Sequence, residues 1–176
     1  DQAWLEDVLA TAGAPRRDRI AALAARPTAL RPLGRALLAH AAAVAGERAL
    51  GRSLLDASVT AGITLTGATG QASLPAPEPY ASSILRSTPR DTALLVRALA
   101  VAWPEHPALP RLVAGLLGAR RLGRYATTQE GAWALLALDE ASRAAPPPPA
   151  ELTARVWLDG APVMQTSLAG PTLRAA

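Results

Sequence analysis

Apolar residues recur at helical spacing through the first third of the chain. Residues 1–12 and 16–25 are two short amphipathic segments, separated by a Gly and a Pro that interrupt helices. Residues 33–45 carry leucines among alanines, and residues 47–60 repeat Leu and Val at intervals of four, one and four. Because the connections are short, we expect these helices to pack as antiparallel αα-hairpins.

A fifth helical stretch has a clear predicted start at Thr88. Thr88 is a candidate N-cap, Pro89 suits the first helical position and Asp91 adds an acid to the first turn. An apolar face of leucines and alanines continues to Ala102, and the following Trp-Pro pair ends the helix.

Two further helices are predicted downstream. One opens at Pro107 and Pro110 and runs out through Gly118 and the Arg120-Arg121 pair to Gly123. Residues 127–130 read Thr-Thr-Gln-Glu, the spacing of a capping box for a helix over residues 129–143. Because residues 132–138 are apolar almost all round, we expect that segment to be deeply buried.

Two parts of the chain alternate with the period of a strand. Residues 63–66 and 71–74 flank a glycine turn and predict a small hairpin inserted between helix pairs, followed by a proline-rich extended loop. Residues 152–158 and 163–168 flank an Asp-Gly turn and predict a C-terminal strand pair. A lone hairpin is marginal in water, so this pair is interpreted as the start of a larger β domain.

Composition narrows the classes of function. The basic residues are all Arg, and 18 of them against 14 acidic residues give a net charge of +4. Aromatic residues make up 3%, which leaves little to stack on bases, so a nucleic-acid partner is not expected. The absence of Cys excludes a thiolate metal site and a Cys nucleophile. Arginine interrupts every apolar run, so we expect no membrane span in this segment.

Three stretches carry a resemblance to a known family. A helix over residues 91–102 leads to a second apolar helix; then Gly123-Arg-Tyr-Ala-Thr-Thr-Gln-Glu130 precedes Ala134-Leu-Leu-Ala-Leu138, and a Pro-rich gap and an alternating strand follow. This order resembles the end of the thioester domain of α2-macroglobulins and complement components, where a Gly-x-Tyr/Trp-x-x-Thr-Gln-Glu/Asp segment precedes an apolar helix and a β domain. The bacterial members are the most similar, and the resemblance covers residues 50–170.

The resemblance implies a mainly α chain that forms part of an α/α toroid. Residues 1–145 would supply about half a ring of antiparallel helix hairpins, residues 146–150 a Pro-rich linker, and residues 151–176 the start of a β-sandwich domain. It implies a non-catalytic structural and interaction segment of a protease inhibitor that traps proteases, in the periplasm or secreted. The implied partners are other domains of the same parent polypeptide and, through the parent, target proteases.

The best-matched motif is interpreted as structural. Capping alone explains the spacing of Thr127 and Glu130, whereas Tyr125 is expected to hold the loop against the helices and Trp133 to pack between helices. No catalytic, cofactor-binding or metal-binding residue is predicted, and no cofactor. The family's reactive Cys-Gly/Leu-Glu-Gln motif has no counterpart because the chain has no Cys. The structural motif comprises Gly123, Tyr125, Thr127, Thr128, Gln129, Glu130 and Trp133.

The remaining titratable residues do not form a predicted site. His40 stands among alanines and is expected at a helix surface or an interface, and His106 in a solvated loop. Neither has a second metal-ligating residue at the usual spacing. The adjacent acids Glu6-Asp7 and Asp139-Glu140 point about 100° apart on a helix and are expected to be solvated.

Two alternatives stay open. An α/α-toroid enzyme of the terpene cyclase or glycan-processing kind would need an aspartate-rich motif or paired carboxylates in an aromatic-lined cavity, and the sequence displays neither. A helical scaffold for protein binding would show a fixed repeat of about 30–45 residues, and none is evident.

Overall fold

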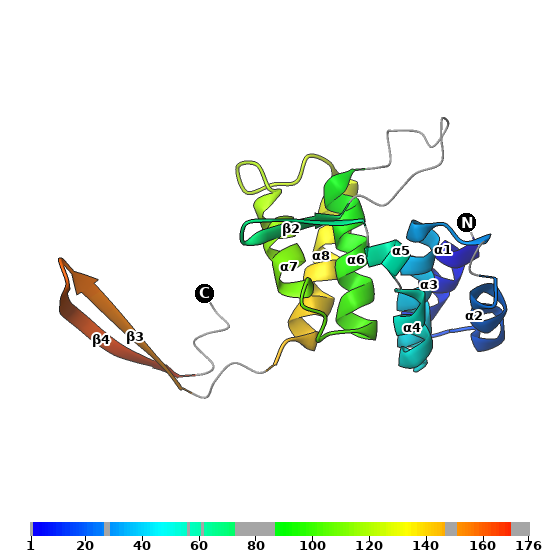
Figure 1. Cartoon of the computed structure of the whole chain (residues 1–176), viewed down its shortest axis with the longest axis horizontal. Helices are drawn as coiled ribbons and strands as arrows, with labels where there is room; N and C mark the ends of the chain where they lie inside the picture. Colours follow the sequence, from blue (N-terminus) through cyan, green and yellow to red (C-terminus); the bar gives the residue numbers. More distant parts are fainter. Residues whose placement is uncertain are drawn as a thin grey trace. The chain divides into compact units, whose positions relative to one another are not determined.

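The chain divides into two compact units, Asp1–Ala144 and Ala145–Ala176. The computed structural model describes residues 2–26, 29–55, 57–60, 62–72, 87–146 and 151–169. The first unit is mainly helical with a small two-stranded antiparallel sheet, and the second contains another such sheet (Figure 1). Over the described residues, every helix is too short or too polar to cross a membrane. The predicted mainly helical fold with two small strand pairs is therefore confirmed.

Helices dominate the first unit, and strands form its inserted hairpin and the second unit. The helices are α1 (Gln2–Thr11), α2 (Arg17–Ala24), α3 (Pro32–Val44), α4 (Arg48–Leu54), α5 (Ala57–Thr60), α6 (Thr88–Ala102), α7 (Leu109–Gly118) and α8 (Thr128–Ala144). The strands are β1 (Ile63–Thr66), β2 (Thr69–Ala72), β3 (Glu151–Leu158) and β4 (Ala161–Ala169).

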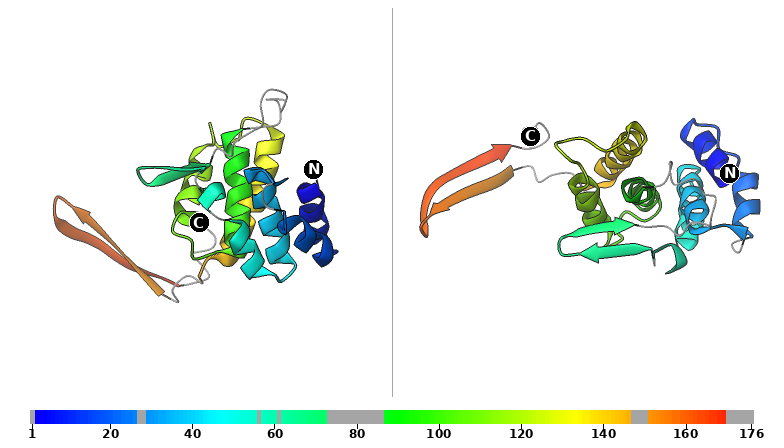
Figure 2. Two further views of the ribbon diagram at one scale, coloured as in Figure 1. Left: turned by 45° about the vertical axis from the view of Figure 1, so that its right-hand side comes forward. Right: turned by 90° about the horizontal axis from the view of Figure 1, so that it is seen from above.

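The longer helices form two rows. In the first row α1 packs on α3, α3 on α6 and α6 on α8. The second row consists of α2, α4 and α7, and each of these contacts the two first-row helices beside it. The view from above in Figure 2 shows this succession across the unit. Each hairpin therefore adds one helix to each row.

The centre of the first row holds most of the core. Every residue of α3 from Ala36 to Ala43 is buried, and α6 is buried almost without interruption from Asp91 to Ala102. Both helices are rich in Ala, which lets backbones approach closely, while leucines such as Leu38 and Leu95 fill the remaining space. The middle turns of these two helices are buried because each helix lies between neighbours in both directions along the row.

Two predicted helix boundaries need correction. The segment 47–60 was predicted as one helix, but the chain leaves α4 at Leu55 (φ −88°, ψ 42°) and resumes as α5. This break leaves both Leu54 and Leu55 buried in the core. The N-cap of α6 is Ser87, whose side chain accepts a hydrogen bond from the Arg90 amide, so the predicted cap at Thr88 is wrong by one residue.

The inserted hairpin packs on α7 through a glycine contact. β1 pairs with β2 in the register Ile63↔Ala72, two residues earlier than predicted for the second strand. A Cβ atom at Gly115 of α7 would overlap the carbonyl oxygen of Gly70 in β2, so only glycine permits this approach. Residues 73 and 74 of the predicted second strand, and the proline-rich loop after them, lie outside the described residues.

The predicted burial of residues 132–138 is wrong. Ala134 and Ala137 of α8 are fully buried, but Leu135 is 70% and Leu136 45% exposed. α8 is the last helix of the first row, so α6 covers one of its faces and no described helix covers the opposite one. The segment 132–138 of α8 is therefore apolar on nearly all sides but buried only on the side that faces α6.

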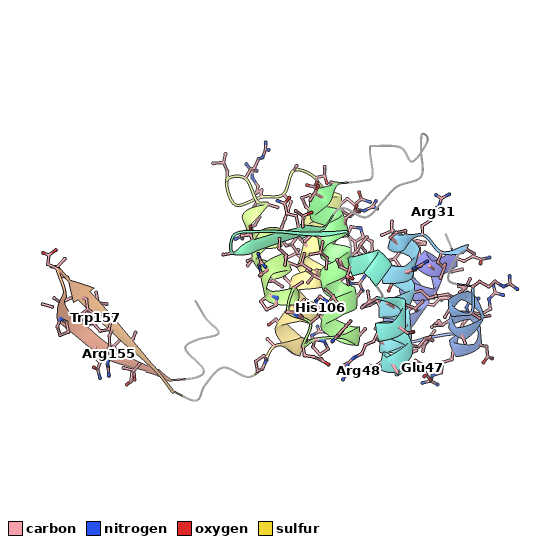
Figure 3. All side chains as sticks on the ribbon, in the orientation of Figure 1. Arg31, Glu47, Arg48, His106, Arg155 and Trp157 are labelled. Atoms are coloured by element: carbon pink, nitrogen blue, oxygen red, sulfur yellow. The ribbon has the colours of Figure 1, made fainter. Side chains whose placement is uncertain are left out.

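The second unit is a single antiparallel hairpin. β3 and β4 pair from Glu151↔Ala169 to Leu158↔Ala161, with a bulge between Val156 and Trp157. Asp159 and Gly160 form the turn with φ values of 49° and 82°, as their type predicts. Apolar residues such as Val156 and Trp157 are about half exposed, and Figure 3 shows Trp157 and Arg155 on β3. The predicted linker residues 147–150 lie outside the described residues.

Candidate functional site

A buried cluster of charged side chains joins all four helices of the first row. It consists of Asp7 from α1, His40 from α3, Arg97 from α6 and Glu140 from α8. The first three are each about 2% exposed, and the Glu140 side chain is 16% exposed. Burying charges is costly unless they are paired. Each member of this charged cluster has such partners.

His40 has a carboxylate at each ring nitrogen. Its Nδ1 lies 2.5 Å from Asp7 Oδ1, and its Nε2 lies 3.1 Å from Glu140 Oε2. An acceptor at each nitrogen favours the doubly protonated imidazolium, and Arg97 Nη2, which lies 3.3 Å from Nε2, opposes it. Burial alone would lower the pKa of His40, but the hydrogen bonds to Asp7 and Glu140 outweigh burial and the repulsion from Arg97, and the pKa is raised above its ordinary value.

Arg97 bridges the two carboxylates from α6. Its Nη1 lies 3.3 Å from Asp7 Oδ2, and its Nε and Nη2 donate to Glu140 Oε1 at 3.1 and 3.0 Å. The guanidinium carbon also lies 5.4 Å from the centre of the Trp133 ring, a cation–π distance. Two carboxylates, one guanidinium and one imidazolium sum to zero charge.

The electrostatics of Glu140 follow from the same contacts. Burial would raise the pKa of Glu140, but the hydrogen bond and charge of His40, and then those of Arg97, lower it below its ordinary value. Glu140 is therefore an anion at neutral pH. A second buried acid, Glu6, pairs with Arg16 on the edge of the unit.

An open depression of about 330 Å³ lies beside the charged cluster. The last residues of α1, α3 and α8 line it, because the first-row helices run in the same direction (Figures 1 and 2). His40 and Glu140 line it from the cluster, and so does Arg48. Arg48 lies at the start of α4, where Figure 3 labels it. The other lining residues are Thr11, Val44, Ala100, Val101, Arg143 and Ala144.

The hydroxyl and the acidic side chains of this region are already engaged by other groups. The Thr11 hydroxyl, the nearest candidate nucleophile, donates to the Asp7 carbonyl at 2.8 Å and accepts from Arg97 Nη2 at 3.5 Å, so His40 does not activate it. Among the described residues, no group of three or more His, Cys, Asp or Glu side chains is placed to hold a metal ion. The cluster carries opposite charges that neutralise one another across four helices.

The loop before α8 contains most of the predicted structural motif. The Glu130 amide donates to Thr127 Oγ1 at 3.1 Å, and the Thr127 amide donates to Glu130 Oε2 at 3.3 Å, which is a reciprocal capping box. The Tyr125 hydroxyl donates to the Leu116 carbonyl at 3.0 Å and ties the loop to α7. Gly123 lies in the preceding turn with φ of 79°.

The other motif residues lie in the first two turns of α8. Thr128 is the first residue of the helix and is exposed, and Gln129 is partly buried. Trp133 is partly buried against the core and lies under Arg97, so it alone of the motif contacts the charged cluster. The motif and the cluster therefore meet at one residue.

Several sequence-based expectations about charged residues are wrong. Of the two positions expected for His40, a helix surface is wrong, because His40 is buried between helices; Glu6, Asp7 and Glu140 are buried or nearly so rather than solvated. Asp139 is exposed as expected and pairs with Arg143. His40 stands between Leu38-Ala39 and Ala41-Ala42-Ala43, and this apolar context was the available signal for burial.

Arg97 was not singled out from the sequence at all. It interrupts the apolar stretch of α6, where Val96 and Ala98 on either side of it are fully buried. A charged residue in a buried helix needs a partner of opposite charge, so the position of Arg97 in the sequence was itself a signal of a buried ion pair.

The chain matches no protein-family model, no curated protein and no solved structure.

Proposed function

We propose that residues 1–145 are a non-catalytic structural and interaction segment of a protease inhibitor of the α2-macroglobulin kind. In this proposal the two rows of helices are an arc of an α/α toroid, and the C-terminal hairpin begins the following β domain. The partners are other domains of the same parent polypeptide and, through the parent, the proteases that it traps. The location is the cell envelope or the medium outside the cell.

The succession of helices supports this proposal. Every hairpin places its first helix in one row and its second helix in the other, which is how concentric rings of α/α toroids are built. The capping box before α8 lies in the stretch that resembles the family's Gly-x-Tyr-x-x-Thr-Gln-Glu segment. The charged cluster fixes the relative positions of four helices, as a rigid module requires.

The observation that carries the proposal is the exposed apolar surface at both ends of the first row. On α1, Trp4 is half exposed and Leu5 and Val8 nearly as much. On α8, Leu135 and Leu136 are exposed, whereas Leu37 and Leu38 of α3 and the leucines of α6 are buried. In stacked helical arrays, internal units bury both faces and terminal units need a cap or a further neighbour. Both ends of this row are suited to such a neighbour.

The first test asks whether the chain has the activity of a complete trap. We expect the 176-residue chain, mixed with serine, cysteine, aspartic and metalloproteases, to leave cleavage of a protein substrate unchanged. A trap needs a bait segment and an enclosing shell, and the proposal assigns neither to this segment. Clear inhibition of any of these proteases by this chain alone would contradict the assignment.

The second test probes the end of the row directly. The double variant Leu135→Glu and Leu136→Glu should lower self-association in sedimentation experiments, and lower the fluorescence of an apolar dye, without changing helix content. The matched control is Leu158→Glu on the C-terminal hairpin, which replaces an exposed leucine outside the array. If the double variant unfolds the chain, or if the control has the same effect, α8 is not an open end of an array.

An enzyme with the same kind of fold is the second candidate, and one observation favours it. The carboxylates of Asp7 and Glu140 converge on His40 beside an open depression, with Trp133 close by. Against it, both carboxylates are already neutralised by His40 and Arg97. Turnover of prenyl diphosphates or oligosaccharides that is lost in Glu140→Gln would favour the enzyme over the structural segment.

A further inference from the structure

The loop between α7 and α8 ends in a tight turn with an unusual apex. Arg121 and Arg124 pair as an isolated antiparallel bridge, and the two residues between them both have positive φ, 51° at Leu122 and 79° at Gly123. This is the pattern of a type I′ turn, whose first central position favours Asn, Asp or Gly. Leucine in the left-handed region is strained, and such outliers gather at functional sites.

Burial of the Leu122 side chain does not offset this strain. Its side chain is 97% exposed, the largest exposure among the large apolar residues described. A glycine or an asparagine would form the same turn without a bulky side chain in water. The sequence therefore keeps an apolar side chain at the tip of a turn where local structure does not require one.

Three arginines surround this apex. Arg120, Arg121 and Arg124 are all exposed, and the bridge sets Arg121 and Arg124 opposite each other, where like charges repel. The Arg120 Nε donates to the Leu117 carbonyl, which holds its guanidinium at the base of the turn. In the part of the chain that the structure describes, no carboxylate forms an ion pair with any of the three.

The backbone of the turn satisfies its own hydrogen bonds. The Arg121 amide donates to the Arg124 carbonyl at 2.8 Å, and the Arg124 amide donates to the Arg121 carbonyl at 3.1 Å. A peptide that enters an apolar environment must bring its polar groups already paired. The tip can therefore leave water at little cost in unmade backbone hydrogen bonds.

We propose that the turn at residues 120–124 docks on an anionic lipid surface, with Leu122 inserted at the headgroup boundary and the three arginines on lipid phosphates. An apolar insertion combined with a basic patch is the pairing of signals that gives reversible attachment to membranes. A protruding tip suits a deformable surface, and a leucine does not stack on bases as nucleic-acid binding would require. The inference is independent of the proposed function.

The test measures binding of the 176-residue chain to vesicles by sedimentation. Vesicles of phosphatidylcholine are compared with vesicles that contain about one third phosphatidylglycerol. We expect binding only to the anionic vesicles, with loss at about 0.5 M salt because salt screens exposed charges. Leu122→Gly keeps the positive φ without strain, so it should remain folded and bind about threefold to tenfold more weakly.

The arginines are tested with a charge-matched pair of variants. Arg121→Gln with Arg124→Gln should weaken binding about thirtyfold, since each arginine near an anionic surface contributes roughly a factor of five. Arg19→Gln with Arg26→Gln removes the same charge from exposed positions near α2 and should bind nearly as the wild type does. Equal weakening by both pairs would reduce the effect to net charge and overturn the proposal.

Three further outcomes would also overturn it. Equal binding of the wild type to both kinds of vesicle would show that the charge of the lipid is not recognised. Unchanged affinity of Leu122→Gly would place the lipid contact elsewhere, for instance on the apolar C-terminal hairpin. Failure of the wild type to bind anionic vesicles would show that the turn does not dock on an anionic lipid surface.

Discussion

Each charge in the buried cluster is balanced by partners on other helices. Asp7 contacts both His40 and Arg97, and so does Glu140. Removal of one cation therefore leaves two carboxylates under-compensated in the core, and an uncompensated buried charge is far more costly than a broken surface pair. Among the charged side chains, the members of this cluster should have the largest effects on stability.

Replacement of Arg97 by Ala should lower the free energy of unfolding by about 3–5 kcal/mol, because Asp7 and Glu140 lose a buried partner. Urea unfolding followed by circular dichroism measures the change. Arg143→Ala is the matched control, because Arg143 pairs with Asp139 on the surface of α8 and its loss should cost less than about 1 kcal/mol. Similar losses in the two variants would mean that the cluster does not stabilise the fold.

Protonation of His40 should make stability depend on pH. Its pKa is raised in the folded protein, so its contribution is fully present below the unfolded value of 6.5 and is lost as the pH rises through the folded value. The free energy of unfolding should therefore fall as the pH is raised above 6.5. In His40→Gln this fall should disappear, and stability on the acidic side should be lower than in the wild type.

The second histidine provides the control for this prediction. Burial lowers the pKa of His106, and its Nδ1 accepts a hydrogen bond from the Ala108 amide. Its contribution is therefore present above pH 6.5 and is lost as the pH falls through the lower folded value. His106→Gln should keep the decline at higher pH, and a flat profile in this variant would assign the effect to the wrong histidine.

Local pairs could be predicted from the sequence at this scale, and distant pairs could not. Thr127 and Glu130 are three residues apart, so a capping box follows from their spacing. His40 and Asp7 are separated by 33 positions, and Arg97 and Asp7 by 90. Only the packing of helices brings such residues together, so their pairing cannot be read from spacing.

At the scale of the helix, the start of α8 depends on Glu130. Its carboxylate accepts from the amides of Ala126 and Thr127, which would otherwise lie unpaired at the helix terminus. Glu130→Ala should therefore cost about 1 kcal/mol in thermal or urea unfolding. Thr128→Ala, in the same turn but exposed, should cost clearly less, and the reverse order would contradict the cap.

The contact between α7 and the inserted hairpin depends on the absence of a side chain at Gly115. Gly115→Ala would set a Cβ against the Gly70 carbonyl, so the hairpin must move, at a cost of about 1–3 kcal/mol. Gly118→Ala is the matched control in the same helix, because nothing lies within 4 Å of its added Cβ. A Gly115→Ala protein as stable as this control would show that β2 does not pack closely on α7.

Helix positions followed from periodicity, but the exposure of α8 did not. A run of Ala, Trp and Leu predicts a helix whatever surrounds it, and it predicts burial only if a neighbour exists on each side. α6 has neighbours in both directions along the row and is buried as its residues suggest, whereas α8 has none beyond it among the described elements. Whether a neighbour exists is a property of the array and not of the helix.

The whole helical unit combines a closed centre with open ends. α3 and α6 are enclosed by helices on both sides, and α1 and α8 each lack a neighbour on one side among the elements described. The charged cluster extends from one end helix to the other through both central helices. Local opening should therefore begin at the outer faces of α1 and α8 and stop where the cluster and the core begin.

Amide hydrogen exchange can measure this gradient. Amides in α3 and α6 should be the most protected, and those in α1 and α8 should exchange faster, because their opening exposes less buried apolar surface. Arg97→Ala should reduce the difference in protection between the central and the outer helices, since the cation that joins α6 to α1 and α8 is lost. Equal protection across the four helices of the wild type would mean that the row opens as one unit. The apolar faces of α1 and α8 would then be ordinary surface. The proposal that these faces bind neighbouring helices would lose its physical basis.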